Sequence, residues 1–195
     1  CAEIEMMQKA SEKAGKNVVC GMKKMFFPAN EKAEQLMNSG EIGKVQTVTI
    51  QYPQRIPELE QITNYIEKRE NNGAVGFLDH LCHPASLMVS LLGMPETLYY
   101  ERSPNGAGMA TFTYKDGTVA VINLTFGSAS NGGMERTLIV GDAGHITVDN
   151  NTRVNLMKHP NLGYGNNPDF YGAAPGNESK TWEPEFSLGQ LYNKG

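Results

Sequence analysis

The clearest pattern in the chain lies at residues 71–93 and predicts one long helix. The stretch opens with the turn residues Asn-Asn-Gly and closes at Gly93, two residues before Pro95. With successive residues placed about 100° apart, its apolar side chains cover one broad face. These apolar positions are 77, 78, 81, 82, 85, 88, 89 and 92.

A narrow polar stripe, formed by Asp79, His83, Ser86 and Ser90, lies on the opposite side of this helix. Asp79 and His83 are four residues apart, so their side chains stack one above the other. A carboxylate and an imidazole at this spacing suit a hydrogen-bonded acid/base pair. Asp79 and His83 are therefore the candidate catalytic residues.

The same residues also allow structural and metal-binding interpretations. Asp79 can be an N-cap, and Pro84 favours a helix that begins nearby, because proline is tolerated in the first turn. His83 can be a surface histidine with no chemical role. Residues 79–83 include Asp, His and Cys, which bind metals, but the sequence holds no second cluster of ligands.

The N-terminal part follows an α/β pattern. Residues 2–16 predict an amphipathic helix, and the apolar run 17–22 predicts a buried parallel strand. The basic and aromatic segment 23–28 marks the crossing to a second structural unit. Residues 30–39 then predict another helix, with Asn30 as its N-cap and Gly40 at its end.

Beyond the long helix the hydrophobic period changes from 3.6 to 2, which predicts strands joined by tight turns. The strands expected there are 96–103, 108–114, 118–125, 136–140, 145–149 and 153–157, and a further strand, 45–51, precedes the long helix. Residues 53–72 predict a long loop with a helical turn. Residues 158–187 predict a loop anchored by Tyr164, Phe170, Tyr171 and Trp182.

These elements predict an α+β fold with one largely antiparallel sheet, covered by helices on one face and open on the other. The strand at 118–125 is largely apolar on both sides, whereas a half-solvated strand alternates apolar with polar residues. An apolar open face marks an interaction surface, so we expect a homo-oligomer that pairs through this face.

Composition narrows the possible partners. The chain has 195 residues and a net charge of −4, which argues against a nucleic-acid partner. No apolar run approaches the length that we expect of a membrane span. Three cysteines without framework spacing indicate free thiols, which are typical of a reducing cytoplasm.

Several landmarks follow one another in register over residues 1–149. A helix and strand ending in Gly21 precede the basic-aromatic crossing at Pro28 and the phrase NSGEIGKV at 38–45. Asp79-x-x-x-His83, an LLG ending and a hairpin over 140–149 come next. This order resembles the C-terminal half of the Gfo/Idh/MocA oxidoreductases, which include glucose-fructose oxidoreductase and inositol dehydrogenase.

The resemblance implies a dihydrodipicolinate reductase-like fold and a division at residue 22. Residues 1–22 would be the remnant helix and strand of a Rossmann domain, and 23–195 the substrate-binding and oligomerisation domain. Family members bind NAD or NADP mainly through the N-terminal Rossmann domain. The sequence contains neither a G-x-G-x-x-G motif nor the family's catalytic Glu-Lys-Pro, so we expect the chain alone to be inactive.

For the site, the resemblance implies that His83 is the acid/base at the hydroxyl carbon and that Asp79 assists it. Ser86 stands where many members have a second Asp. The expected function is NAD(P)-dependent oxidation at a CH–OH group of a sugar, cyclitol or related polyol, without nucleic-acid or membrane partners. The alternative is a non-catalytic binding or assembly module that retains the fold.

Overall fold

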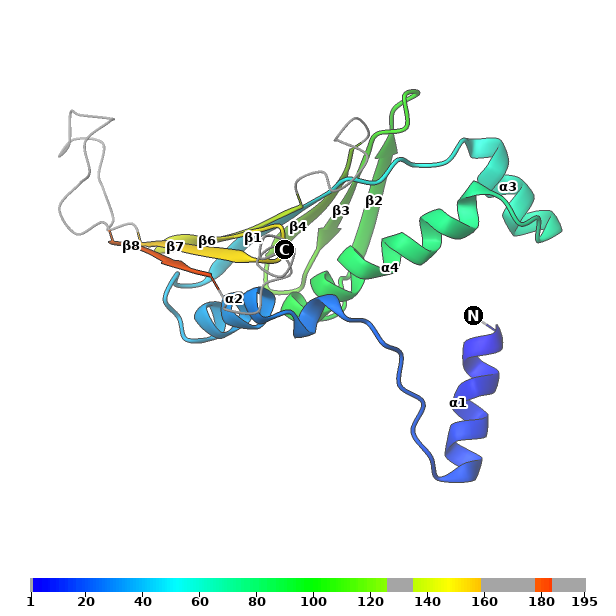
Figure 1. Cartoon of the computed structure of the whole chain (residues 1–195), viewed down its shortest axis with the longest axis horizontal. Coiled ribbons are helices and arrows are strands. Elements are labelled where there is room, and N and C mark those ends of the chain that lie inside the picture. The colour runs from blue at the N-terminus through cyan, green and yellow to red at the C-terminus, as the bar shows by residue number, and fades with distance from the viewer. Residues whose placement is uncertain (1, 126–134, 159–177, 184–195) are drawn as a thin grey trace, which may run out of the picture.

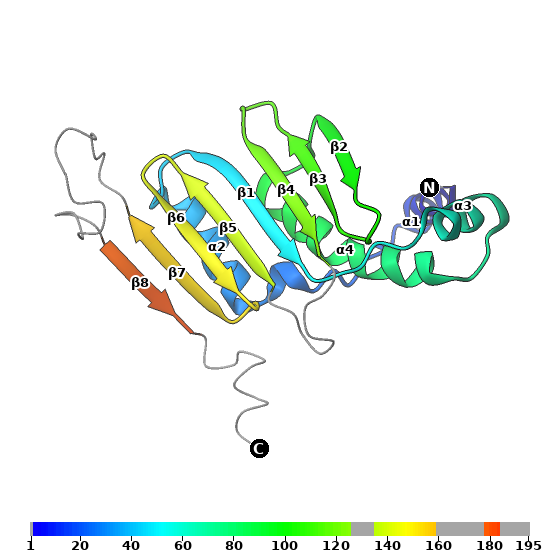
Figure 2. The same ribbon diagram turned by 90° about the horizontal axis from the view of Figure 1, so that it is seen from above.

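The structure, a computed structural model, describes residues 2–125, 135–158 and 178–183, and its centre is an eight-stranded sheet. The strand order is β2-β3-β4-β1-β5-β6-β7-β8 (Figure 2). β1 and β4 pair in parallel, and all other neighbours pair antiparallel. The strands are β1 Val45–Tyr52, β2 Thr97–Arg102, β3 Gly108–Thr113, β4 Val119–Leu124, β5 Arg136–Gly141, β6 Gly144–Asp149, β7 Arg153–Lys158 and β8 Glu178–Trp182.

The helices cover one face of this sheet (Figure 1). α2 (Pro28–Asn38) packs on β6 and β7, and α4 (Gly73–Leu92) packs on β1 and on the short 3-10 helix η1 (Lys24–Phe26). α3 (Leu59–Lys68) packs on α4. The predicted α+β fold, with a largely antiparallel sheet and one open face, is confirmed.

Alternation along β4 explains why the covered face forms the core. Ala120, Ile122 and Leu124 point to the helices and are almost completely buried, while Val119 and Val121 lie on the open face. Across the parallel pair, Ile122 lies opposite Ile50 of β1, which is also buried. Burial of these branched side chains is the main stabilising term of the fold.

The NSGEIGKV phrase forms the turn that leads into β1, and its Gly43 fits against the β5–β6 hairpin. Gly43 has a φ of +71°, and a Cβ at this position would lie 1.8 Å from the Asp142 carboxylate. That carboxylate accepts a hydrogen bond from the Lys44 backbone N–H at 2.9 Å. A Cβ on Gly141 would lie 2.0 Å from the Ile42 carbonyl oxygen. Only glycine allows this approach of the two turns.

The predicted strand at residues 17–22 is wrong. This segment has no strand pairing, and Val18 and Val19 are 64% and 85% exposed. A buried parallel strand requires neighbours on both sides, and no strand of the described sheet pairs with it. The preceding helix forms as α1 (Ala2–Ala14), buries none of its residues and lies apart from the sheet in both views (Figures 1 and 2). The domain boundary at residue 22 stays a prediction.

The predicted N-cap at Asn30 is also wrong. α2 begins at Pro28 after the capping residue Phe27, because proline needs no intrahelical partner in the first turn. Asn30 lies inside the helix, 3% exposed, and its side chain donates to the Lys24 carbonyl at 2.7 Å. The residue therefore ties η1 to α2.

Two loop predictions need correction. The segment 53–72 contains a full helix, α3, whose start carries a capping box between Glu58 and Gln61. The segment 158–187 contains β8, an edge strand paired with β7. Trp182 packs against the core, as the anchoring role requires. The other predicted anchors, Tyr164, Phe170 and Tyr171, lie outside the described residues.

By length and composition, α4 is long and apolar enough to cross a membrane, so the expectation that no segment reaches that length is wrong. A core helix passes the same test. Phe77, Leu87, Met88 and Leu91 of α4 are buried on the helix-covered side of the sheet. This packing accounts for part of the apolar composition, because Val75, Leu78 and Val89 of the same helix are exposed.

Candidate active site

The candidate site lies on α4, whose ends are fixed by local hydrogen bonds. The Asn72 side chain caps the first turn by accepting from the Ala74 N–H at 2.9 Å, and its amide donates to the Gln61 carbonyl at 3.0 Å. The helix ends at Gly93, whose φ is +77°. Asp79 therefore lies in the second turn, and its interpretation as an N-cap is wrong.

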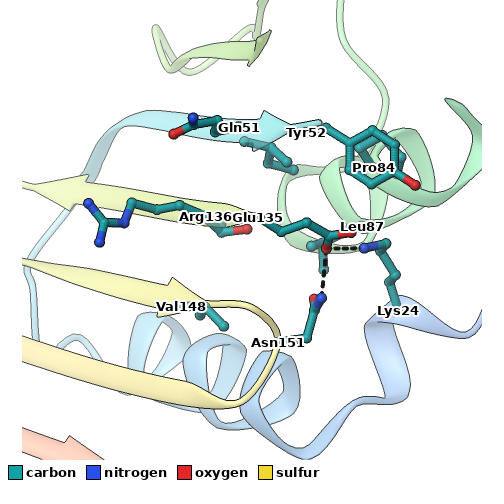
Figure 3. A pocket seen from close by; sticks show the side chains of 11 residues that line it. Lys24, Gln51, Tyr52, Pro84, Leu87, Glu135, Arg136, Val148 and Asn151 are labelled. Atoms are coloured by element: carbon teal, nitrogen blue, oxygen red, sulfur yellow. Dashed lines mark hydrogen bonds and ion pairs between the residues drawn. The ribbon is translucent and has the colours of Figure 1, made fainter. Parts of the chain in front are cut away.

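Pro84 stands in the interior of α4, not in the first turn that the sequence suggested. Because proline has no N–H, Pro84 cannot donate to the His80 carbonyl one turn earlier. Its ring is fully buried and lines a small pocket beside Tyr52 of β1 (Figure 3). The turn of α4 that carries His83 is thus held against the sheet by side-chain packing.

The polar stripe is present on α4, although its side chains are not joined as a pair. Asp79 is exposed and His83 is half-buried, and no hydrogen bond links them in the described part of the chain. Instead the Cys82 thiol donates to the Asp79 carbonyl at 2.8 Å and lies 3.8 Å from His83 Nδ1. Ser86 Oγ donates to the His83 carbonyl at 3.0 Å.

The surroundings of His83 favour its neutral form. Partial burial lowers the pKa of the imidazole, and the positive charges of Lys23 and Lys24 lower it further. The Asp79 carboxylate acts in the opposite direction, because a nearby negative charge stabilises the imidazolium. A histidine that is neutral near pH 7 can accept a proton from a hydroxyl group.

A partly buried ion pair lies beneath this turn of the helix (Figure 3). The Lys24 ammonium contacts the Glu135 carboxylate, and it lies 5.0 Å from the centre of the Tyr52 ring. Burial and the charge of Glu135 raise the pKa of Tyr52 to about 12, so the phenol keeps its proton. The sequence did not single out these residues, since they come from three distant segments.

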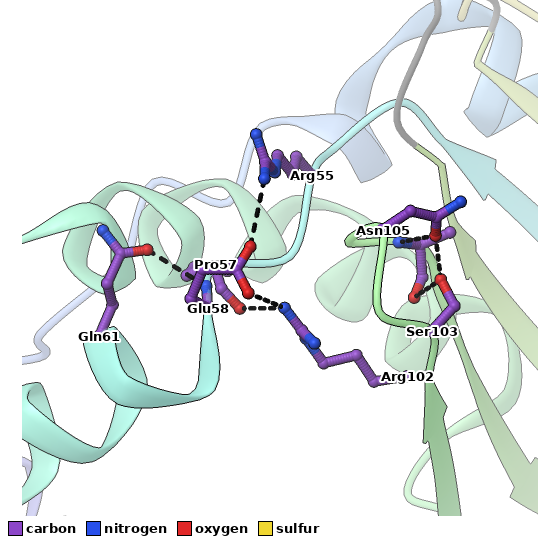
Figure 4. Close-up of polar contacts among 8 residues, drawn as sticks. Arg55, Pro57, Glu58, Gln61, Arg102, Ser103 and Asn105 are labelled. Carbon is purple, nitrogen blue, oxygen red and sulfur yellow. Dashed lines mark hydrogen bonds and ion pairs between the residues drawn. The ribbon is translucent and has the colours of Figure 1, made fainter.

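A second polar cluster joins the segment after β1 to the end of β2 (Figure 4). The Glu58 carboxylate accepts from Arg55 at 3.1 Å and from Arg102 at 2.9 Å. Arg102 also donates to the Pro57 carbonyl at 3.2 Å. These contacts lower the pKa of Glu58. The Glu58-x-x-Gln61 capping box after Pro57 was the sequence signal that could have revealed this helix start.

The metal-binding interpretation of residues 79–83 finds no support in the geometry. Within residues 2–125, 135–158 and 178–183, no group of three His, Cys, Asp or Glu side chains is arranged to hold a metal ion. His80 and His83 have ring centres 6.5 Å apart and tilted planes. Burial is the main cause that raises the pKa of the neighbouring Cys82 thiol. The raised pKa disfavours the thiolate, which is the form that binds metals.

The comparison with protein families decides the family of the chain. Residues 30–147 match the model of the GFO/IDH/MocA C-terminal domain. The chain belongs to this family. The match includes α4 with Asp79 and His83, and the NSGEIGKV turn. The sequence resemblance is confirmed, although no curated protein sequence matches this GFO/IDH/MocA chain.

Solved structures share the fold of this GFO/IDH/MocA domain. A dehydrogenase from Chromobacterium violaceum matches with a TM-score of 0.68 and 14% identity over 94% of this chain and 51% of its own. Levoglucosan dehydrogenase in complex with NADH and levoglucosan matches with 0.63 and 12% identity, over 92% and 50%. The WlbA dehydrogenase from Bordetella pertussis, in complex with NADH and UDP-GlcNAcA, matches with 0.58 and 20% identity, over 74% and 46%.

These identities support a shared fold and carry no more than that. The chain spans about half the length of the structures that it matches. The dinucleotide that two of them hold does not fit the residues of this chain, because its sequence lacks the glycine-rich phosphate loop that precedes a Rossmann helix.

Proposed function

We propose that this chain is the substrate-binding and oligomerisation domain of an NAD(P)-dependent oxidoreductase acting on a CH–OH group of a sugar, cyclitol or related polyol. The supporting observation is His83, a half-buried imidazole biased towards its neutral form on α4, within the family match. The NADH complexes of levoglucosan dehydrogenase and of WlbA agree with this class of reaction.

In this proposal His83 moves the proton of the reaction. Nδ1 faces the Cys82 thiol at 3.8 Å, which leaves Nε2 for the substrate hydroxyl. Nε2 accepts the hydroxyl proton as the carbonyl forms, and the imidazolium returns it in the reverse reaction. The Asp79 carboxylate favours this imidazolium through its charge, without a direct hydrogen bond.

The dinucleotide would be bound mainly by residues other than those of this chain. The hydride acceptor and the catalytic lysine of the family's Glu-Lys-Pro motif therefore lie outside the chemistry that these 195 residues supply. In this proposal the chain contributes proton transfer and one wall of the substrate site. NAD and NADP are equally compatible with that contribution.

The open face of the sheet is the proposed surface for pairing with a second copy. Val119 and Val121 of β4 lie there, and Val119 is 38% exposed. Leu138 and Val140 of β5, on the other side of β1, occupy the same face, opposite Thr49 and Thr47 of β1. A two-fold axis through this face would bury these branched side chains against their own copies.

A non-catalytic module remains a second candidate, because one observation favours it. Asp79 is exposed and makes no hydrogen bond to His83, so the pair is not preorganised in the way that carboxylate–imidazole pairs are in many enzymes. An enzyme and a module of this fold differ in turnover. The discriminating experiment is NAD(P)-linked oxidation of a panel of sugars and cyclitols by the whole protein. Oxidation of any of them supports the proposal, and bound dinucleotide without turnover across the panel supports the module.

A further inference from the structure

A network of polar side chains beneath α4 connects the η1–α2 region, the segment before β5 and the turn between β6 and β7 (Figure 3). Lys24 from η1 contacts Glu135, which lies just before β5. Asn151, in the turn between β6 and β7, donates to the same Glu135 carboxylate at 2.6 Å. Asn30 of α2 donates to the Asn151 side-chain oxygen at 3.1 Å.

The network is built at some cost to the fold. The Lys24 side chain is 7% exposed and that of Glu135 26%, and buried ion pairs rarely stabilise a fold more than apolar residues of the same size. Asn150 and Asn151 both have positive φ, at 50° and 56°, a region that asparagine adopts more readily than most residues other than glycine. In this turn the Asn150 side-chain oxygen accepts a hydrogen bond from the Glu135 backbone N–H at 2.9 Å, and the Asn151 amide donates to the Glu135 carboxylate.

The network reaches the candidate site through Lys24. The Lys24 ammonium lies over the Tyr52 ring, and Tyr52 lines the same small pocket as Pro84 and Leu87 of α4. η1 itself packs against α4. Pro84 follows His83 directly and lacks a backbone donor, so this turn depends on the packing beneath it for its position.

We propose that Lys24 is a positioning residue for His83, fixed under α4 by Glu135 and Asn151. This inference rests on the function proposed for His83 and adds a residue that acts through it. Lys24 lies over the Tyr52 ring in the pocket that Pro84 also lines, and its charge opposes protonation of the imidazole. The cost of burying the ion pair is then explained by the placement of one positive charge where it acts on the imidazole through space.

The charged groups around His83 are consistent with this role. Lys23 and Lys24 from the segment at η1 disfavour the imidazolium, and so does His80 on α4. Asp79 alone of the acting charges favours it. Tyr52 of β1 is neutral up to a pKa of about 12, and Cys82 has a raised pKa, so neither adds charge near neutral pH.

The test is an NMR titration of the His83 ring in the 195-residue chain. The double variant Lys24→Met/Glu135→Leu removes the ion pair without leaving one charge buried alone. We expect the pKa of His83 to rise by about half a pH unit in this variant. Lys24→Arg, tested alone, should keep the parent value because it keeps the charge. His145, on the opposite face of the sheet, serves as the internal reference.

Two further variants separate positioning from general effects on the fold. Asn151→Gly changes no charge, and glycine adopts the positive φ readily, yet the variant removes the Asn151 hydrogen bond that holds the Glu135 carboxylate in place. The pKa of His83 should move towards that of the double variant. Lys32→Met is the matched control, because Lys32 also lies 5.0 Å above an aromatic ring, that of Trp182, but does not act on His83. It should leave the titration unchanged.

An unchanged pKa of His83 in both the double variant and Asn151→Gly overturns the inference. So does an equal change in Lys32→Met. These results do not depend on turnover: a whole protein in which His83→Ala keeps full activity refutes the proposed function, whereas the titration speaks only to Lys24. In the whole protein, the same variants should move the acid limb of the pH profile of kcat/KM to higher pH, by the same amount as the pKa of His83.

Discussion

Asp79 and His83 lie one helical turn apart on α4, and the His83 ring contacts the Cys82 thiol at 3.8 Å but makes no hydrogen bond to the Asp79 carboxylate. The carboxylate therefore influences the imidazole through space. This arrangement separates the effect of its charge from that of a direct hydrogen bond. The direction in which a substitution of Asp79 changes the pKa of His83 therefore follows from the charge that it removes.

Asp79→Asn should lower the pKa of His83, because it removes the one nearby charge that favours the imidazolium. The kcat of the whole protein should fall as well, since the charge formed on His83 loses its stabilisation. The acid limb of the pH–rate profile should move to lower pH. A rise in the pKa of His83 on this substitution would contradict the through-space role of Asp79.

The 195-residue chain should bind neither NAD nor NADP. Its sequence has no G-x-G-x-x-G motif and no Glu-Lys-Pro, so it lacks the backbone cradle for a pyrophosphate. Isothermal titration calorimetry of the chain with each dinucleotide should show no saturable heat. Micromolar binding of either dinucleotide would contradict the proposal that residues outside this chain bind the dinucleotide.

Lys24→Met should destabilise the chain by about 2–3 kcal/mol, because it leaves the Glu135 carboxylate largely buried without its cation. The cost is below that of a fully buried pair, since Glu135 keeps 26% of its side chain exposed. Lys24→Met/Glu135→Leu should recover most of the loss. Urea denaturation measures both, and a double variant no more stable than the single one would show that the pair is not coupled.

The chain should associate through the open face of the sheet. Val121→Glu places a charge in the middle of that face and should shift the light-scattering mass towards the monomer. Met94→Glu is the control, because Met94 is 79% exposed just beyond α4 and outside this face. A monomeric parent chain at tens of micromolar, or equal effects of the two variants, would end the open-face proposal.

Local patterns were sufficient for most of the fold. Period-2 alternation located the strands from β2 to β7 within a few residues, and the turn at Gly117, with φ of +92°, was visible as Lys-Asp-Gly. Pairing partners are not encoded locally. The apolar run at 17–22 therefore suggested a buried strand that has no neighbour in the described sheet.

The candidate site was predictable only in part. Asp79 and His83 share one face of α4, as their spacing required, but the position of Cys82 between them depends on rotamers that spacing does not determine. Lys24, Glu135 and Asn151 meet through the tertiary fold alone, since more than a hundred residues separate Lys24 from its partner. Polar clusters assembled from such distant segments leave no periodic signal.

The central claim is that His83 transfers the proton. The most direct test is the steady-state kcat of the whole protein with the polyol that it oxidises. His83→Ala should lower kcat by about 10²–10⁴, the usual effect of losing a general acid/base. His80→Ala, an exposed histidine on the same helix, is the matched control and should leave kcat nearly unchanged. A His83→Ala enzyme with kcat within about threefold of the parent, well short of that effect, would contradict the account.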